Sequence, residues 1–286
     1  MAKQRSEEVM QTMKIIKVLN NNAVIILDED EQEQIAIGNG VGFNKRKHDP
    51  ISEEKIEKRF VLKGHEKLQE LLVQIPQEHF HISKEIIAHA EKQLKTTLHD
   101  QILLALTDHI SFAIEREAQG IHLKNKLLNE IKILYKAEYE IGLWAIGFIK
   151  DEINVQMPID EAAFIALHIH TMKFKAGNVQ ETVRQTSMLR DMVEIIKSNL
   201  HLSFAEDAIS YERLITHLRF ALARTYDQTA HAMDKEMQQM IKRKFKVSHQ
   251  CAEEVAKTLA SKYDITLPGD ELCYIALHIE RLRNTE

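Results

Sequence analysis

ALTDHISFAIER (105–116) and RLITHLRFALAR (213–224) share five residues at matched positions, and these include His109 and His217. The two stretches are offset by 108 residues (213 − 105). Both place apolar residues at the three- and four-residue spacing of an amphipathic helix. A repeat of this length is too long for a solenoid unit and fits a duplicated domain.

A second pair of stretches strengthens this interpretation. MPIDEAAFIALHIHTM (157–172) matches LPGDELCYIALHIERL (267–282) at an offset of 110 residues (267 − 157), with His168 opposite His278. Each copy therefore carries two position-matched histidines, while most of the residues around them differ. The sequence predicts two homologous helical domains that perform the same histidine chemistry.

Length, charge and cysteine content restrict the number of domains and the kinds of partner that the chain can have. The chain has 286 residues and a mass of 33.1 kDa, which predicts two or three domains. Its formal net charge of −5 excludes a general attraction to nucleic acid, so such binding would need a local surface. The two cysteines, Cys251 and Cys273, have no metal or redox spacing and are typical of a reducing cytosol.

No segment predicts membrane insertion or export. The longest uncharged apolar run, GLWAIGFI (142–149), is far shorter than the ~20 residues of a spanning helix. Residues 1–12 are charged and have no apolar core, so they do not resemble a signal peptide and are treated as an extension. We expect a cytoplasmic protein.

The N-terminal region has the composition of a small antiparallel β-sheet. Short β-branched runs alternate with turn formers, and the expected strands are 14–19, 23–27, 34–37 and 60–62. Three of the nine glycines gather at Gly38, Gly40 and Gly42. A sheet of about fifty residues is marginal alone, so dimerisation would help it to bury a core.

Helical spacing dominates from about Glu66 onward, in segments such as 65–75, 128–149 and 212–224. Asp160 and Asp270 each follow a proline by two residues, which predicts N-caps for the helices that carry His168 and His278. The pattern lapses at 174–180, between the copies. The expected fold is multi-domain: a small antiparallel β-sheet domain (13–65) followed by two homologous all-α bundles (66–175 and 176–286).

The sequence resembles the BglG/SacY-type transcriptional antiterminators of bacteria over nearly all of its length after residue 12. MKIIKVLNNNAVI, IGNGVGFNKR and EEKIEKRF resemble the family's co-antiterminator RNA-binding domain. The LTDH and IALHI contexts resemble its phosphotransferase-system regulation domains.

The resemblance implies a homodimer that binds a hairpin in a leader mRNA and prevents an overlapping terminator from forming upstream of a sugar-utilisation operon. It implies control by phosphorylation of His109, His168, His217 and His278. The expected phosphate donors are the phosphocarrier HPr and a sugar-specific enzyme II permease. In relatives, phosphate on the first regulation domain tends to silence the protein and phosphate on the second tends to activate it.

The resemblance also implies a set of RNA-binding residues, which are Lys17, Asn20, Asn22, Gly38, Asn39 and Phe43. Their chemistry fits, because unpaired bases are recognised by stacking on aromatic rings and by hydrogen bonds to their edges. Lysines, with the cluster 45–47, supply phosphate contacts. Several relatives carry a basic residue where this chain has Asn39, which is expected to weaken the salt-dependent part of binding or to alter the preferred base.

The residues alone leave a simpler interpretation open for this region. Asparagine- and glycine-rich stretches also form ordinary hairpin turns, and Phe43 would then belong to the core. Residues 13–62 contain 8 basic and 9 acidic residues, a net charge of 8 − 9 = −1, so charge does not favour RNA binding.

Histidine suits a transferable phosphate, because its neutral ring is nucleophilic near pH 7. Arg116 and Arg224 each follow a histidine by seven residues, two helical turns along the same face. We expect these guanidinium groups to neighbour the phosphate, where they would bind it or neutralise a docking carboxylate. Glu161 and Glu271 precede the other histidines by seven residues and would orient a ring or repel a phosphate.

Ordinary half-buried histidines are the alternative, and we assign that role to those without a counterpart in the other copy, such as His79. His168 and His170 do not predict a metal site, since residues two apart on a helix point about 200° away from each other. The chain suggests no cofactor.

Two other functional classes compete. A DNA-binding activator built on the same modules would need a helix-turn-helix ahead of them, whereas 13–62 predicts strands. An enzyme would need a catalytic motif, and the chain contains no P-loop, nucleophile elbow, dinucleotide fingerprint or HExxH motif. A phosphorelay protein is conceivable but leaves the N-terminal domain without a purpose. We therefore expect no enzymatic activity.

Overall fold

The computed structural model describes residues 12–27, 31–61, 75–173, 178–201, 209–227 and 233–284. These residues fall into two compact parts. One part contains the chain up to residue 92 together with 98–121 and 148–157, and the other contains 93–97, 122–147 and everything from 158 onward.

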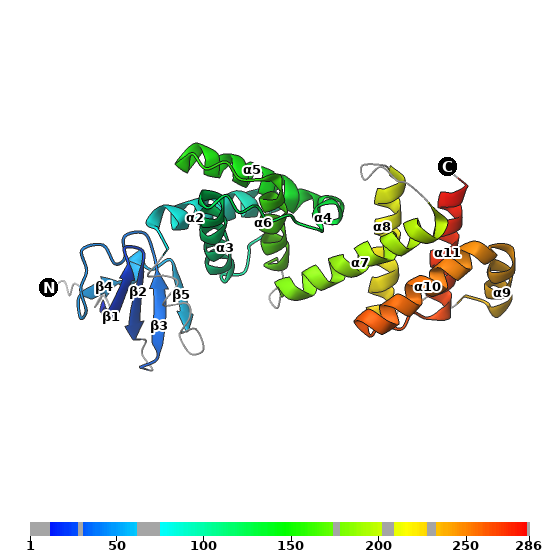
Figure 1. The fold of residues 1–286 in the computed structure, drawn as a ribbon. Helices are drawn as coiled ribbons and strands as arrows, with labels where there is room; N and C mark the ends of the chain where they lie inside the picture. The colour runs from blue at the N-terminus through cyan, green and yellow to red at the C-terminus, as the bar shows by residue number, and fades with distance from the viewer. Residues whose placement is uncertain are drawn as a thin grey trace, which may run out of the picture. The chain divides into compact units, whose positions relative to one another are not determined.

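The N-terminal sheet has five antiparallel strands in the order β4-β1-β2-β3-β5 (Figure 1). The strands are β1 (Thr12–Asn20), β2 (Ala23–Leu27), β3 (Glu33–Ile37), β4 (Pro50–Ser52) and β5 (Lys58–Val61). The small antiparallel sheet is confirmed. Strand β4 was not predicted, because three residues that begin with proline give little strand signal, and proline suits only an edge strand such as this one. Residues 28–30 and Leu62, in predicted turn and strand, lie outside the described residues.

The sheet core comes from the β-branched runs. Ile15, Val24, Ile26 and Ala36 form a buried cluster with Val41 and Ile51. The neighbouring β2 residue Ile25 is also buried, so β2 is covered on both faces. A central strand buried in this way is expected to read as a continuous apolar run, as AVIIL does.

Ten helices follow in the described residues, and they repeat in order. The first copy contains α2 (Gln77–Leu94), α3 (Ile102–Ala118), α4 (Leu128–Leu134), α5 (Lys136–Ile153) and α6 (Ile159–Thr171). The second contains α7 (Val179–Leu200), α8 (Ile209–Asp227), α9 (Lys235–Lys244), α10 (Lys246–Tyr263) and α11 (Gly269–Arg283). The predicted helical pattern at 65–75 lies outside the described residues except for Ile75, which precedes α2.

The backbone keeps the repeat in detail. Helices α5 and α10 begin and end 110 residues apart (246 − 136 and 263 − 153). The expected continuous helix over 128–149 is interrupted at Tyr135, and Phe245 interrupts the second copy at the matched position. Asn154 (φ 55°) and Asp264 (φ 58°) adopt the left-handed conformation after these helices, which asparagine and aspartate tolerate better than most residues.

The prediction that Asp160 and Asp270 are N-caps is wrong. Pro158 and Pro268 occupy the cap positions with extended backbone (ψ 156° and 153°), so each aspartate lies inside the first helical turn. Asp160 Oδ1 instead accepts a hydrogen bond from the backbone N–H of Asn125 at 2.7 Å. Asp270 accepts one from the side chain of Gln238. The carboxylates therefore tie a preceding segment to the helix start.

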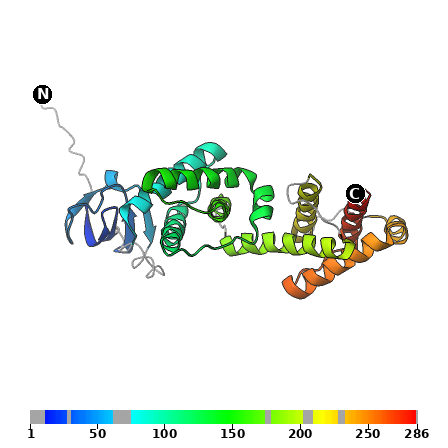
Figure 2. The same ribbon diagram turned by 45° about the horizontal axis from the view of Figure 1, so that its top comes forward.

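In the second compact part, α8 and α11 lie side by side (Figures 1 and 2) and contribute to one core with α7 and α10. Helix α4 of the first copy joins this core through Ile133 and Leu134. The Tyr211 hydroxyl donates to Glu130 Oε1 at 2.8 Å, which fixes α4 against α8.

Candidate functional site

The glycine-rich loop after β3 is fastened to the turn between β1 and β2 by backbone hydrogen bonds. Gly38 N donates to Asn22 O (3.0 Å), and Gly42 N donates to Asn21 O (2.9 Å). The Asn22 side chain adds a third contact, because its Oδ1 accepts from Gly40 N at 2.8 Å. The loop and the hairpin turn therefore form one rigid unit.

Asn20 organises the turn itself. Its Oδ1 accepts a hydrogen bond from Asn22 N at 2.8 Å, which is the local side-chain bond that makes asparagine a turn former. The asparagines at 20 and 22 thus have structural roles within the predicted site.

Two glycines are required by close approach and one by conformation. A Cβ at Gly38 would overlap the backbone oxygen of Lys55, and a Cβ at Gly42 would overlap that of Asn20. Gly40 has φ +65°, which favours glycine. The glycines let two backbone segments pack at contact distance.

Phe43 is not a core residue. Its side chain is 59% exposed, although its backbone is held in the loop by a hydrogen bond from Phe43 N to Gly40 O at 3.1 Å. An exposed aromatic ring on a fixed backbone is a ready stacking surface for an unpaired base. Lys17 is also exposed, on β1 three residues before Asn20.

The start of α2 contacts the same loops. Asn21 Nδ2 donates to Gln77 Oε1 at 3.0 Å. Glu57 accepts from the backbone N–H of Asn39 (3.0 Å) and pairs with Lys84 Nζ (2.5 Å). Burial would raise the pKa of Glu57, but its bonds with Lys84 and Asn39 lower it on balance.

These contacts surround a small cavity of about 130 Å³, lined by Asn22, Ile37, Gly38, Asn39, Glu57, Gln77, Phe80, His81 and Lys84. The predicted residues Asn22, Gly38 and Asn39 share this cavity. Phe43 and Lys17 are not among its lining residues. The predicted RNA-binding residues therefore fall into two groups. Asn22, Gly38 and Asn39 line the cavity beside α2, whereas the exposed side chains of Phe43 and Lys17 lie elsewhere in the domain.

The two histidines of the second copy meet face to face. His217 on α8 and His278 on α11 stack with ring centroids 3.7 Å apart and an interplanar angle of 17°. Burial, then His217, Arg224 and Arg281, lowers the pKa of His278 to about 4. Burial and three nearby arginines also lower the pKa of His217. Both rings are neutral near pH 7, the nucleophilic form.

The pair opens into a pocket of about 430 Å³, lined by Ile209, Ser210, Arg213, Leu214, His217, His278, Arg281 and Leu282. Two arginines and two neutral imidazoles share its wall. The arginines can bind an anion, and the neutral imidazoles can attack an electrophilic atom within it.

Arg224 is held by a carboxylate and is not among these lining residues. Its Nε and an η nitrogen donate to the two oxygens of Glu271, each at 2.7 Å, and Glu271 is fully buried. The bidentate bond raises the pKa of Arg224. The positive charge of Arg224 lowers the pKa of both histidines, although Arg224 does not line the pocket.

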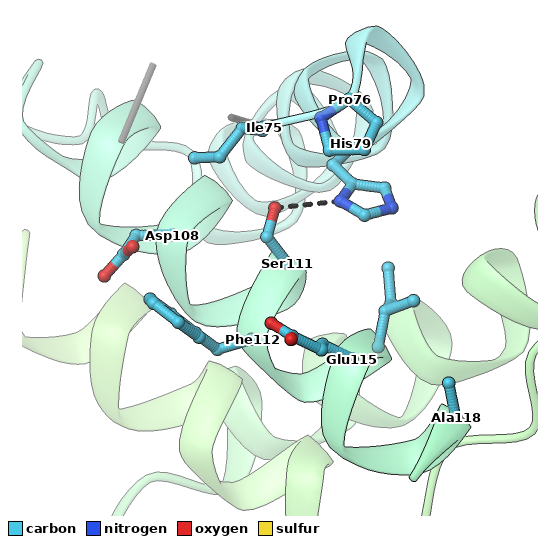
Figure 3. Close-up of a pocket in the computed structure, with 9 residues that line it drawn as sticks. Ile75, Pro76, His79, Asp108, Ser111, Phe112, Glu115 and Ala118 are labelled. Carbon is cyan, nitrogen blue, oxygen red and sulfur yellow. Dashed lines mark hydrogen bonds between the residues drawn. The ribbon is translucent and has the colours of Figure 1, made fainter. Parts of the chain in front are cut away.

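The histidines of the first copy are both half-buried, His109 on α3 and His168 on α6. Arg116, on the same helix as His109, is also half-buried. Beside α3 lies a hollow of about 340 Å³, lined by Asp108, Phe112 and Glu115 of α3 and by residues at and just before the start of α2 (Figure 3). His79 Nδ1 and Ser111 Oγ are 2.8 Å apart across it. This contact fits the ordinary structural role expected of His79.

His170 has a buried carboxylate partner. Its Nδ1 lies 2.9 Å from Glu138 Oε1, which also accepts from Lys173 Nζ at 2.9 Å. Burial raises the pKa of Glu138, but these bonds outweigh it and hold the pKa at about 2. In the described part of the chain, no three His, Cys, Asp or Glu residues are placed to hold a metal ion.

Sequence reasoning overlooked Arg213 and Arg281, although the signal was present. Arg213 precedes His217 by four residues and Arg281 follows His278 by three, the spacings of neighbours on one helix face. The seven-residue spacing from His217 instead indicates Arg224, which pairs with Glu271.

Comparisons with known proteins match the same segments. The PRD domain family matches residues 84–172 and again 190–282, and the CAT RNA binding domain family matches 13–69. Among the described residues, no helix has the length and apolar character to cross a membrane.

Relatives match over nearly the full length. The beta-glucoside operon antiterminator of Dickeya chrysanthemi is 38% identical over 276 residues, 95% of this chain and 97% of the relative. Transcription antiterminator LicT of Bacillus subtilis (strain 168) is 36% identical over 274 residues, 94% of this chain and 99% of the relative. The crystal structure of GlcT CAT-PRDI covers 58% of this chain and all of its own, with 36% identity and a TM-score of 0.50.

Proposed function

Because this chain belongs to the transcription antiterminators that carry a CAT RNA-binding domain ahead of two PRD domains, we propose that it binds a leader-mRNA hairpin as a homodimer in the cytoplasm. Binding keeps the overlapping terminator from forming, and transcription continues into a sugar-utilisation operon. The chain is a regulator rather than an enzyme, as its relatives are. We assign the domains to 13–65, 66–175 and 176–286, with 1–12 as an extension.

The observation that carries the RNA-binding assignment is Phe43, a large ring that is 59% exposed on a fastened loop. A ring held in this way stacks on a base with little further loss of conformational entropy. Asn20, Asn22 and Asn39 supply amide groups for base edges, and Gly38 keeps the loop backbone close. Lys17 supplies a phosphate contact.

The strand composition of residues 12–61 counts against the DNA-binding alternative. In the described part of this region the one helical segment is a 3₁₀ turn, Glu53–Lys55. A recognition helix for the major groove needs a longer helix that can enter it. The phosphorelay alternative does not use the loop at all.

Control comes from phosphate on His109, His168, His217 and His278, delivered by HPr and by a sugar-specific enzyme II permease. The neutral, stacked pair His217 and His278 supports this assignment for the second domain, because the unprotonated ring nitrogen is the attacking form. A phosphate adds about 1.5 to 2 negative charges, enough to shift a packed interface. Arg224, held by Glu271, is a positive charge near the second pair, and we assign Arg116 the matching role in the first domain.

The test is a titration of the full-length chain against the leader hairpin of the adjacent sugar operon, with the same sequence as duplex DNA as the control. We expect binding to the RNA hairpin alone. Phe43→Ala should weaken binding by about 1–3 kcal/mol, the contribution of one stacked base. Phe220→Ala removes a similarly exposed ring (49%) from the second PRD domain and should leave RNA affinity unchanged. Equal loss in both variants would remove Phe43 from the site.

Regulation is tested with His217→Asp/His278→Asp, which places negative charge at the second pair. If the second domain is the activating one, this variant should increase dimerisation and antitermination. No change in either would contradict the assignment.

A further inference from the structure

We infer that Arg213 and Arg281 form a phosphoryl-binding pocket around His217 and His278, and that the first PRD domain lacks this pair of arginines, because Ala105 and Thr171 occupy the matched positions. The inference rests on the proposed phosphorylation of the histidines and adds to it. It makes the second domain the one that captures and retains phosphate by direct contact.

The two arginines are placed from different helices onto one pocket. Arg213 on α8 and Arg281 on α11 line the same 430 Å³ hollow as the stacked rings. Each lies one helical turn from its own histidine. Both are exposed to solvent. An anion entering the pocket therefore meets a guanidinium beside each imidazole.

Arg224 does not compete for this role. Its guanidinium is fixed on Glu271 by two hydrogen bonds of 2.7 Å. Releasing it would leave a fully buried carboxylate without its partner, which is costly. Arg213 makes the better candidate because guanidinium groups at a pocket wall are placed for bidentate contact with phosphate oxygens.

The duplication supplies an internal comparison. Arg213 is matched by Ala105 in the first copy, and Arg281 is matched by Thr171. Thr171 is buried, and its hydroxyl donates to Leu167 O at 2.7 Å. It cannot act as a cation, and Ala105 offers no polar group.

The residues just before His109 and His217 increase the difference in charge between the two copies. Asp108 precedes His109, whereas Thr216 precedes His217. At these three matched positions the second copy carries two positive charges and the first carries one carboxylate, a difference of 2 − (−1) = 3 charges when Asp108 is ionised. At these three positions, a phosphoryl group with about 1.5 to 2 negative charges meets one carboxylate in the first copy and two guanidinium groups in the second. These positions therefore favour phosphate binding in the second copy.

The transfer step needs no further group. An unprotonated ring nitrogen of His217 or His278 attacks phosphorus, and a new N–P bond forms while the bond to the leaving group breaks. With phosphoramidate as the donor, that bond is also N–P. In its zwitterionic form the nitrogen already carries three hydrogens, so it departs with the bonding electron pair as ammonia, while the other ring nitrogen of the histidine keeps its proton and later releases it to ammonia or to water. The arginines hold the phosphoryl oxygens before and after the step, so they act as binding residues.

The experiment uses full-length chains that keep one histidine pair. His109→Ala/His168→Ala leaves the second pair, and His217→Ala/His278→Ala leaves the first. Each protein is incubated with phosphoramidate, and phosphohistidine is followed by ³¹P NMR for its rate of formation and, after donor removal, its rate of loss. In the protein that keeps the second pair, Arg213→Ala/Arg281→Ala should slow formation and speed loss, each by about tenfold, the scale of one charge-assisted contact.

Arg219→Ala is the matched control, because Arg219 lies exposed on the same helix over the Phe220 ring and is not among the pocket residues. It should change neither rate. Arg213→Lys keeps the charge and should recover part of the effect, which a loss of folding would not allow. Equal rates in the double variant and its parent, or an equal effect of Arg219→Ala, would overturn the inference.

The two levels of failure are distinct. If neither histidine pair accepts phosphate in the parent proteins, the proposed phosphorylation is wrong and this inference falls with it. If both pairs accept phosphate while the arginine variants behave like their parent, the phosphorylation stands and the pocket assignment alone is wrong. Ala105→Arg in the protein that keeps the first pair should raise retention there, because residue 105 lies one turn before His109 on α3.

Discussion

The side chain of Asn22 is bonded to the backbone of Gly40, with Oδ1 accepting from the amide N–H at 2.8 Å. This bond joins the first hairpin of the sheet to the loop that presents Phe43. The predicted RNA-binding set therefore contains residues of two kinds: those that hold the loop and those that the loop displays. Substitutions should separate the two kinds.

Asn22→Ala should reduce both local stability and RNA affinity. Removing Oδ1 leaves the Gly40 N–H without its acceptor, a cost of about 1–2 kcal/mol. Hydrogen exchange of the β2 and β3 amides measures this loss. Phe43→Ala should leave the same amides protected, because its exposed ring supports no core. Unchanged exchange in Asn22→Ala would mean that the loop is held by its backbone bonds alone.

Gly38→Ala should destabilise the sheet domain by about 1–3 kcal/mol, the usual cost of forcing atoms into a packed site. The new Cβ would overlap Lys55 O, a backbone atom that cannot turn aside. Gly147→Ala is the control, because its Cβ meets nothing within 4 Å on α5. It should stabilise the helix by about 0.5–1 kcal/mol. Both effects are measured by urea unfolding, and equal stability of the two variants would contradict the overlap.

Arg224→Met should destabilise the second PRD domain by about 3–5 kcal/mol, because it leaves the carboxylate of Glu271 buried and uncompensated. Replacing both partners, as in Arg224→Met/Glu271→Leu, should recover most of this loss. Thermal unfolding of the four proteins of this double-mutant cycle gives the coupling. Additive losses would show that the two residues do not stabilise the fold as a pair.

The free energy of unfolding of the second domain should decrease as the pH is lowered below about 6.5. The folded state holds the pKa of His278 at about 4, below its ordinary value of 6.5, because burial and neighbouring positive charge disfavour the protonated ring. Between these values the unfolded chain binds more protons, so the free energy of unfolding decreases as pH falls from 6.5 and the loss is complete below about 4. His278→Gln should flatten this part of the curve measured by denaturant unfolding. A parallel curve in the variant would assign the titration to another group.

The duplicated pattern explains why much of the fold was predictable. Helical spacing and two histidine contexts were sufficient to define two copies, and the β-branched runs predicted four of the five described strands. The first residues of the helices were harder to predict from the sequence. Asp160 fits the sequence signature of an N-cap, but the preceding proline takes that position and frees the carboxylate for Asn125.

The sequence indicates which residue types the candidate site contains, but not which side chains contact one another in it. The i+7 spacing predicts that Arg224 lies on the same side of its helix as His217, and only the fold shows that Glu271 holds it. Arg213 and Arg281 belong to helices far apart in sequence, so their shared pocket depends on how α8 and α11 pack. The role of Glu57 in bonding both Asn39 and α2 was equally inaccessible, because it depends on tertiary contact.

The packing of α4 against α7 and α8 has a consequence for how the molecule can be divided. Tyr135 and Thr186 bring their hydroxyls to 3.2 Å, Tyr211 bonds Glu130, and Ile133 and Leu134 complete the core of the later copy. A truncated gene product that ended between the repeats would expose these apolar side chains to water and invite aggregation. The two copies are therefore joined by packing as well as by the chain, and separating them would remove the contacts that α4 makes with α7 and α8.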